Sequence, residues 1–302
     1  MFEKFTVFIL GAGASKHYHF PTGNELKEII RKGLSEEGRW LLEGSEQFPA
    51  FSSKIRELVT TLDRSGLAID DHLASHPGLQ EVGKYLIAKI ILAKEVEENL
   101  HRDGWYVDLW QRLWPGKRAL ENLAGSTVAF ITFNYDRSLE QSLFVKACNS
   151  YDASNRKSIA EQLKGIPIVH VHGQLGALDW QDYLDGMDQK LYESPSKPEE
   201  VFKCSQYIKI VDETAASSGE YMKAKELVEK AEIIHFLGFG YHAENLQRLR
   251  VGSLRAEKVS GTCLNLDLKR RPEVAGKSDK NQFGREIELH DMGIDEYFRS
   301  VV

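Results

Sequence analysis

The chain has 302 residues, of which 42% are hydrophobic and 28% charged, as in a globular protein with a large buried core. Its net charge of -6 argues against a non-specific nucleic-acid coat, because binding to phosphates needs a dense basic face. We therefore expect no direct nucleic-acid binding. The compact basic run Lys269–Arg271 is read as a solvated loop or helix start.

The three cysteines, Cys148, Cys204 and Cys263, lie far apart and form no Cys-x-x-Cys pair. This spacing excludes a four-cysteine zinc site and argues against a disulfide framework, so we expect no metal and a reducing compartment. The apolar run at the N-terminus is too short for a secretory signal, and the apolar segment 84–94 is interrupted by lysines. The sequence predicts a soluble cytoplasmic protein without a membrane span.

The first predicted strand, Phe5 to Leu10, is apolar on both faces, as in the centre of a parallel sheet. Thr22 is positioned to cap a helix that follows Gly23. Between the strand and the helix lies a run of small residues: Gly11, Ala12, Gly13, Ala14 and Ser15. Such a turn lets a backbone approach a pyrophosphate, but it lacks the third glycine of the dinucleotide fingerprint. By itself it fits either a nucleotide loop or a tight turn without a ligand.

The chain from about 35 to 120 has a charged, helix-like pattern and is predicted to be a helical insert between two strands of one sheet. Further strand-like runs follow at Ser126 to Asp136, Gly165 to Gly173, Ala231 to Gly240, and Gly261 to Leu268. Helical segments alternate with the last of them, which predicts an α/β fold with a Rossmann-like doubly wound parallel sheet. The segment from about 174 to 219 lacks periodicity and is predicted to form a small irregular second lobe.

Open parallel sheets bind ligands outside the carboxyl ends of their strands. Small and polar residues stand at the predicted strand ends: Gly11 to Ser15, Asn134 to Asp136, His172, Gly238 to Gly240 and Asn265. Trp105, Trp110 and Trp114 recur at helical spacing and are assigned to the core rather than to a stacking platform.

Taken together and in this order, four motifs resemble the SIR2 family of NAD-consuming proteins. They are G-A-G-A-S at 11–15, T-F-N-Y-D at 132–136, H-G at 172–173 and F-L-G-F-G at 236–240. The resemblance spans Val7 to about Leu268 and implies a single SIR2-like NAD-binding domain over residues 1–302. It implies phosphate contacts from Gly11, Ala12, Gly13 and Ser15, a nicotinamide contact from Asp136, and adenosine-side contacts from Gly238 and Asn265.

Departures from the sirtuin pattern reduce the number of functions that the resemblance implies. Phe20 to Leu26 replaces the Gly-Ile-Pro-Asp-Phe-Arg loop of the deacylases, Phe133 replaces their glutamine, and their four-cysteine zinc site is missing. The chain is similar in this to bacterial SIR2-like proteins of anti-phage defence, which hydrolyse NAD. The resemblance implies an NAD glycohydrolase that releases nicotinamide and ADP-ribose. A non-catalytic NAD or ADP-ribose sensor and a sirtuin-type deacylase stay open as alternatives.

Two residues are the candidates for the chemistry. Cleavage of the bond between ribose and nicotinamide requires a positioned water that loses a proton. The amide of Asn134 can orient water and a ribose hydroxyl, and an imidazole at His172 can accept the proton. A packed core histidine is the alternative for His172, and His170 is read as structural. Because no sensor domain is recognised, an activating partner protein or self-assembly into an oligomer would supply the trigger.

Overall fold

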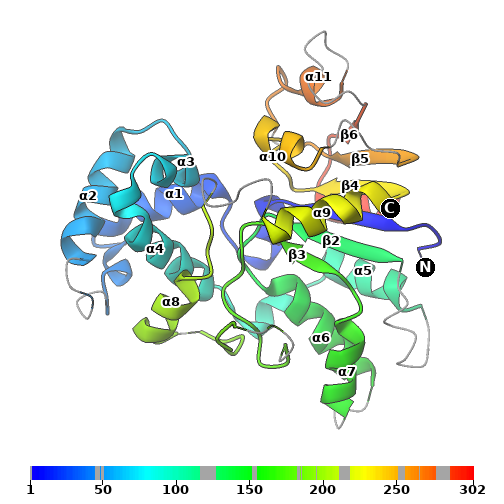
Figure 1. Cartoon of the computed structure of the whole chain (residues 1–302), viewed down its shortest axis with the longest axis horizontal. Coiled ribbons are helices and arrows are strands. Elements are labelled where there is room, and N and C mark those ends of the chain that lie inside the picture. Colours follow the sequence, from blue (N-terminus) through cyan, green and yellow to red (C-terminus); the bar gives the residue numbers. More distant parts are fainter. Residues whose placement is uncertain are drawn as a thin grey trace.

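The structure is a computed structural model, and it describes residues 2–44, 48, 51–115, 127–151, 155–181, 184, 186–194, 196–210, 218–250, 256–264, 266–276 and 286–302. Six parallel strands form one sheet in the order β3-β2-β1-β4-β5-β6 (Figure 1). This order confirms the predicted α/β doubly wound sheet. The strands are β1 (Thr6–Leu10), β2 (Val128–Thr132), β3 (Ile168–His170), β4 (Ile233–Leu237), β5 (Lys258–Thr262) and β6 (Glu288–His290).

Strand β1 lies at the centre of the sheet, between β2 and β4. All five of its residues are buried, as its two apolar faces predict. Ile9 pairs with Ile131 on one side and with Phe236 on the other. The strand order reverses between β1 and β4, and in such sheets this reversal opens the crevice where ligands bind. The loops after β1 and β4 therefore flank the place where a nucleotide is expected.

Two clusters of buried side chains cover the faces of the sheet. Phe8 and Phe130 belong to the larger cluster, together with residues of α5 (Trp105–Leu113), α6 (Ser138–Ser150), α7 (Arg156–Leu163) and α12 (Ile294–Ser300). Val7 and Ile131 belong to the second cluster, with residues of α9 (Gly219–Lys230), α10 (Ala243–Arg248) and α11 (Arg271–Val274). Helices on both faces bury every residue of β1 and β2.

The chain between β1 and β2 is helical where it is described. Its main helices are α1 (Gly23–Arg31), α2 (Phe51–Arg64), α3 (Ile69–Ala74), α4 (Gln80–Leu92) and α5. Helices α1 to α4 gather to the left of the sheet in Figure 1. Trp105 and Trp114 are buried in the larger cluster and Trp110 packs against it, which confirms their assignment to the core.

The segment predicted as an irregular lobe contains one helix among its described residues, α8 (Pro198–Ser205). This helix lies against α4 on the helical side of the molecule (Figure 1). Phe202 stacks on Phe48 with 4.8 Å between ring centroids. The lobe thus packs on the helical insert although about a hundred residues separate them in sequence.

Two sequence predictions need correction at the edge of the sheet. The strand predicted at Gly261 to Leu268 is instead β5, which begins at Lys258 and ends at Thr262. The strand was predicted from a run that is apolar on both faces, but beyond Thr262 Leu264 and Leu268 are 55% and 72% exposed. Strand β6 was not predicted, because three residues carry too short a pattern.

The predicted start of the first helix is confirmed. The hydroxyl of Thr22 accepts from the N–H of Glu25 at 3.4 Å, and the N–H of Thr22 donates to the Glu25 carboxylate at 2.9 Å. These reciprocal bonds form a capping box, which satisfies two N–H groups at the start of α1. Across the described ranges, no helix is long and apolar enough to cross a membrane.

Candidate functional site

The glycine loop after β1 packs directly against the loop after β4. The N–H of Gly11 donates to the carbonyl of Leu237 and that of Gly13 to the carbonyl of Gly238, both at 3.0 Å. A Cβ atom added to Gly13 would lie 2.8 Å from the Cα of Gly238. Gly238 itself has a φ of +56°, in the region that favours glycine. Close packing of two backbones is therefore sufficient reason for these glycines, whether or not a pyrophosphate binds.

The residues after the glycines do not enter an α-helix at once. Ala12 begins a 3-10 helix that ends at Tyr18, and α1 starts only after the capping box. The carbonyl of Ala14 accepts from the indole Nε1 of Trp105 at 2.9 Å. The N–H of Ala14 donates to the carbonyl of Gly11 at 2.8 Å. The loop is thus held from inside by backbone bonds and by one buried tryptophan.

Asn134 joins the glycine loop to the end of β2. Its Nδ2 donates to the carbonyl of Gly11 at 3.0 Å and to the hydroxyl of Ser15 at 3.1 Å. Its own N–H donates to the hydroxyl of Thr132 at 3.0 Å. Because a carbonyl oxygen can only accept, the atom that faces Gly11 must be the amide nitrogen. The orientation of the amide is therefore fixed by chemistry.

The other end of the same amide has no partner. Asn134 is 8% exposed, and its Oδ1 is a buried acceptor without a hydrogen bond among the described residues. Buried polar atoms are normally satisfied, since an unmade bond costs about 1–3 kcal/mol. An unpaired acceptor next to a glycine loop is suited to a donor brought by a ligand, such as a hydroxyl group or water.

Asp136 and Ser15 are engaged with one another and with the start of α6. The Asp136 carboxylate accepts from the N–H of Ser138 at 3.1 Å and from the hydroxyl of Ser138, and it also bonds the hydroxyl of Ser15. Burial raises the pKa of the Asp136 carboxyl. Ser15 has one hydroxyl hydrogen, and in this structure it points to Asp136 while the oxygen accepts from Asn134. Both side chains therefore brace Asn134.

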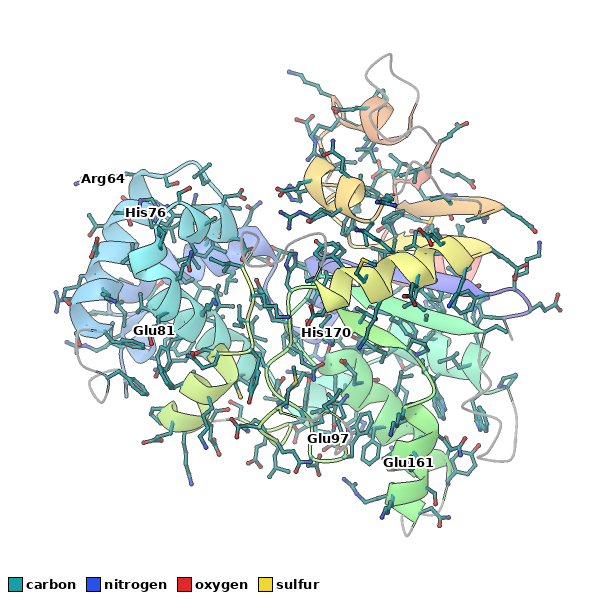
Figure 2. All side chains as sticks on the ribbon, viewed as in Figure 1. Arg64, His76, Glu81, Glu97, Glu161 and His170 are labelled. Atoms are coloured by element: carbon teal, nitrogen blue, oxygen red, sulfur yellow. The ribbon has the colours of Figure 1, made fainter. Side chains whose placement is uncertain are left out.

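His170 supports Asn134 from behind. Its Nδ1 lies 2.9 Å from the carbonyl of Asn134, and its Nε2 bonds the carboxylate of Glu140 on α6. Burial by itself lowers the pKa of a histidine, but the charge and hydrogen bond of Glu140 raise the pKa of His170 above its ordinary value. Figure 2 shows His170 in the middle of the molecule, beside the helical part of the chain. Both ring nitrogens are used, as a structural histidine requires.

His172 lies in different surroundings. Its ring meets the ring of Phe133 edge to face at 5.4 Å and that of Tyr221 at 6.3 Å. Burial, with a smaller contribution from the positive charge of Arg248, lowers the pKa of His172 to about 4. Phe133 also packs on Phe239 at 5.0 Å. The imidazole is therefore neutral at pH 7 and stands among aromatic rings.

The structure brings most of the predicted site residues together. Direct contacts join the glycine loop, Asn134, Asp136 and Gly238. His172 stands on the aromatic side of the same sheet edge, and the hydrogen bond to the Asn134 main chain comes from His170 instead. Asn265 lies outside the described residues.

Sequence reasoning missed the buried residues that hold this edge in place. The Arg137 guanidinium pairs with the carboxylate of Glu95, and both side chains are fully buried. Arg137 Nη1 also donates to the carbonyls of Ala177 and Lys190, at 3.1 and 2.8 Å. The available signal in the sequence was Arg137, a charged residue next to Asp136. Its partners, however, lie about forty residues away in both directions along the chain.

In the part of the chain that the structure describes, no group of three or more His, Cys, Asp or Glu residues could hold a metal ion. A scan against models of protein families gives no match to this chain, and a search of curated proteins gives none either. The resemblance to the SIR2 family thus remains a prediction based on the motifs of the chain.

Proposed function

We propose that this protein binds NAD across the carboxyl edge of the sheet, over the loops after β1 and β4, and cleaves the bond between nicotinamide and ribose. In the reaction a water oxygen bonds to the anomeric carbon, nicotinamide leaves with the electron pair of the broken bond, and the water gives up a proton. The products are nicotinamide and ADP-ribose.

The observation that carries this proposal is the amide of Asn134. Gly11 and Ser15 hold its nitrogen, so its buried oxygen is a fixed acceptor without a hydrogen bond among the described residues. A ribose hydroxyl or the attacking water supplies the donor that this oxygen lacks. A group held in this way orients a reactant without first having to be ordered itself, which lowers the barrier to reaction.

His172 takes the role of proton acceptor in this proposal. Because the pKa of His172 is lowered to about 4, its imidazole is unprotonated at neutral pH and able to accept a proton. Its basicity is weak for this work, and its ring packs on Phe133 and Tyr221. Proton transfer therefore requires the aromatic rings to leave a path for water to the imidazole.

A sensor that binds NAD or ADP-ribose without cleaving it is the second candidate. It is favoured by the internal use of Ser15 and Asp136, which already satisfy each other, and by the aromatic packing of His172. A sensor needs contacts to the phosphates and the adenine but no group that activates water. The two candidates differ in turnover, not in binding.

The test is to titrate the purified protein with NAD, NADP and ADP-ribose by calorimetry and to follow nicotinamide release by chromatography. Binding with release supports the enzyme. Binding without release at high protein concentration supports the sensor. If none of the three nucleotides binds, both candidates are wrong.

The resemblance to defence proteins extends the proposal to a cellular role. An NAD hydrolase of this kind would deplete NAD in the cytoplasm of an infected bacterium, and it would need a trigger from a partner protein or from oligomer assembly. Co-expression with phage challenge, followed by measurement of cellular NAD, tests this role. Unchanged NAD levels in infected cells would contradict it.

A further inference from the structure

Arg137 ties the irregular lobe to the end of β2. Its Nη1 atom donates to the carbonyl of Lys190 at 2.8 Å, and its Nη2 atom donates to the carbonyl of Leu191 at 3.5 Å. Arg137 directly follows Asp136 in the chain, and its own side chain is fully buried. Tyr192, the next residue of the lobe, is therefore brought close to the turn that follows β2.

The side chain of Tyr192 is buried beside this turn. It is 7% exposed, and its hydroxyl lies within range of the charges of Glu95, Asp136, Arg137 and Glu140. The hydroxyl has no hydrogen-bond partner among the described residues. A buried tyrosine normally bonds its hydroxyl, because an unmade bond in the interior is costly. Burial also raises the pKa of Tyr192 well above its ordinary value, so the hydroxyl keeps its proton and can donate.

The other hydroxyls beside this turn are engaged in hydrogen bonds. Those of Ser15 and Ser138 both donate to the Asp136 carboxylate. Since the Ser138 hydrogen is used there, the hydroxyl of Tyr106 is the donor in its 2.7 Å bond to Ser138. Of these four hydroxyls, all in the described part of the chain, that of Tyr192 is the one whose hydrogen has no acceptor.

A carboxamide needs a donor of this kind. In the proposed function, nicotinamide is bonded to the ribose beside Asn134, so its carboxamide lies close to the same turn. The NH2 of a carboxamide donates and its oxygen accepts. Asp136 already accepts two hydrogen bonds from Ser138 and one from Ser15, and a carboxylate has about four acceptor positions. It can take the NH2 but has no hydrogen to donate, so the carboxamide oxygen needs a donor from another residue.

We propose that the Tyr192 hydroxyl donates a hydrogen bond to the carboxamide oxygen of nicotinamide. The irregular lobe then forms one wall of the nicotinamide site, although it lies far from Asn134 in the sequence. This inference rests on the proposed binding of NAD. It does not require cleavage, so it holds for the enzyme and for the sensor alike.

Calorimetry with two nucleotides that contain no cleavable bond to nicotinamide tests the proposal. The carbocyclic analogue of NAD keeps the nicotinamide but is not hydrolysed, and ADP-ribose lacks the nicotinamide. Tyr192→Phe should weaken binding of the analogue by about tenfold, because the carboxamide oxygen loses its donor, and should leave the affinity for ADP-ribose unchanged.

The outcomes separate this inference from the proposed function. Unchanged affinity of Tyr192→Phe for the analogue, or equal weakening for both nucleotides, would overturn the role of Tyr192 and leave the proposed function standing. If the natural protein does not bind the analogue at millimolar concentration, the proposed function is wrong and the inference fails with it.

The midpoint of thermal unfolding gives a readout that depends on no ligand. Because the Tyr192 hydroxyl is unpaired, Tyr192→Phe should unfold at the same temperature as the natural protein or higher. Tyr207→Phe is the matched control in the lobe, since the Tyr207 hydroxyl accepts from the N–H of Asp188 at 2.8 Å and donates to the carbonyl of Gly186 at 3.3 Å. The control should lower the midpoint slightly and leave both affinities unchanged. A lower midpoint for Tyr192→Phe would show that its hydroxyl has a structural partner, against the proposal.

Discussion

The carboxyl edge of the sheet has a polar side and an aromatic side, and they begin at neighbouring residues. On the polar side, Asn134 bonds Gly11 and Ser15, and Asp136 bonds Ser15 in turn. On the aromatic side, Phe133 and His172 pack on one another. The two sides differ in their surroundings, since hydrogen bonds connect the side chains of one side and aromatic rings pack together on the other.

This difference indicates which residues could bind a ligand. Nearly every polar group on the polar side has a partner, so the unpaired Oδ1 of Asn134 stands out as an exception. On the aromatic side, burial lowers the pKa of His172, because a charged imidazole cannot be solvated there. The fixed acceptor of Asn134 and the neutral imidazole of His172 could both serve in the proposed cleavage of NAD. The position of the acceptor is the better defined of the two.

The largest expected effect on stability concerns the buried pair that supports the polar side. Arg137→Met leaves the Glu95 carboxylate buried without its partner, which typically costs about 3–5 kcal/mol. Urea denaturation should show a lower free energy of unfolding by that amount. The matched control is the double variant Arg137→Met/Glu95→Met, which removes both charges and should recover much of the loss. An equal free energy of unfolding for the single variant and the natural protein would show that the pair does not contribute to stability.

Titration of His172 tests how strongly the aromatic side is shielded from water. His172 has a folded pKa of about 4, below the ordinary value for histidine, so the unfolded chain binds more protons between these two values. Stability should therefore fall as the pH is lowered from about 6.5 to 4, and His172 should account for about 3 kcal/mol of that fall. The measurement is the free energy of unfolding at pH 7 and pH 4.

The matched variant for the titration is His172→Phe, which keeps a ring but cannot be protonated. Its stability should decline less between pH 7 and pH 4 than that of the natural protein. His235, whose pKa burial lowers to about 3, is present in both proteins and cancels in the comparison. Identical pH profiles would mean that His172 is more solvated than its aromatic neighbours suggest.

A smaller effect is expected where the two loops meet. Gly13→Ala places a Cβ 2.8 Å from the Cα of Gly238, so a backbone must shift at a cost of about 1–3 kcal/mol. Gly23→Ala is the control, because a Cβ at Gly23 meets nothing within 4 Å. Thermal unfolding should show a lower midpoint for the first variant and little change for the second. If both behave alike, the contact with Gly238 does not explain the glycine.

The sequence was sufficient for the central strands, because β1, β2 and β4 are short apolar runs that end in polar or glycine residues. It was misleading at β5, because the apolar run continues past the end of the strand at Thr262 to Leu264 and Leu268, which are exposed. For the site, strand ends identified Asn134 and Asp136, since parallel strands bring their carboxyl ends to one edge. The environment of His172 was not predictable. Its neighbour Tyr221 comes from a helix about fifty residues later, and no local sequence pattern indicates this contact.

The central claim is that the fixed acceptor of Asn134 acts on the ribose or on the attacking water. The most direct measurement compares nicotinamide release from NAD by the natural protein and by Asn134→Ala, with NAD binding measured by calorimetry in parallel. We predict that the variant folds and still binds NAD, while release falls by at least about 100-fold, because the reactants are no longer oriented. Release at the natural rate from folded Asn134→Ala would contradict the claim.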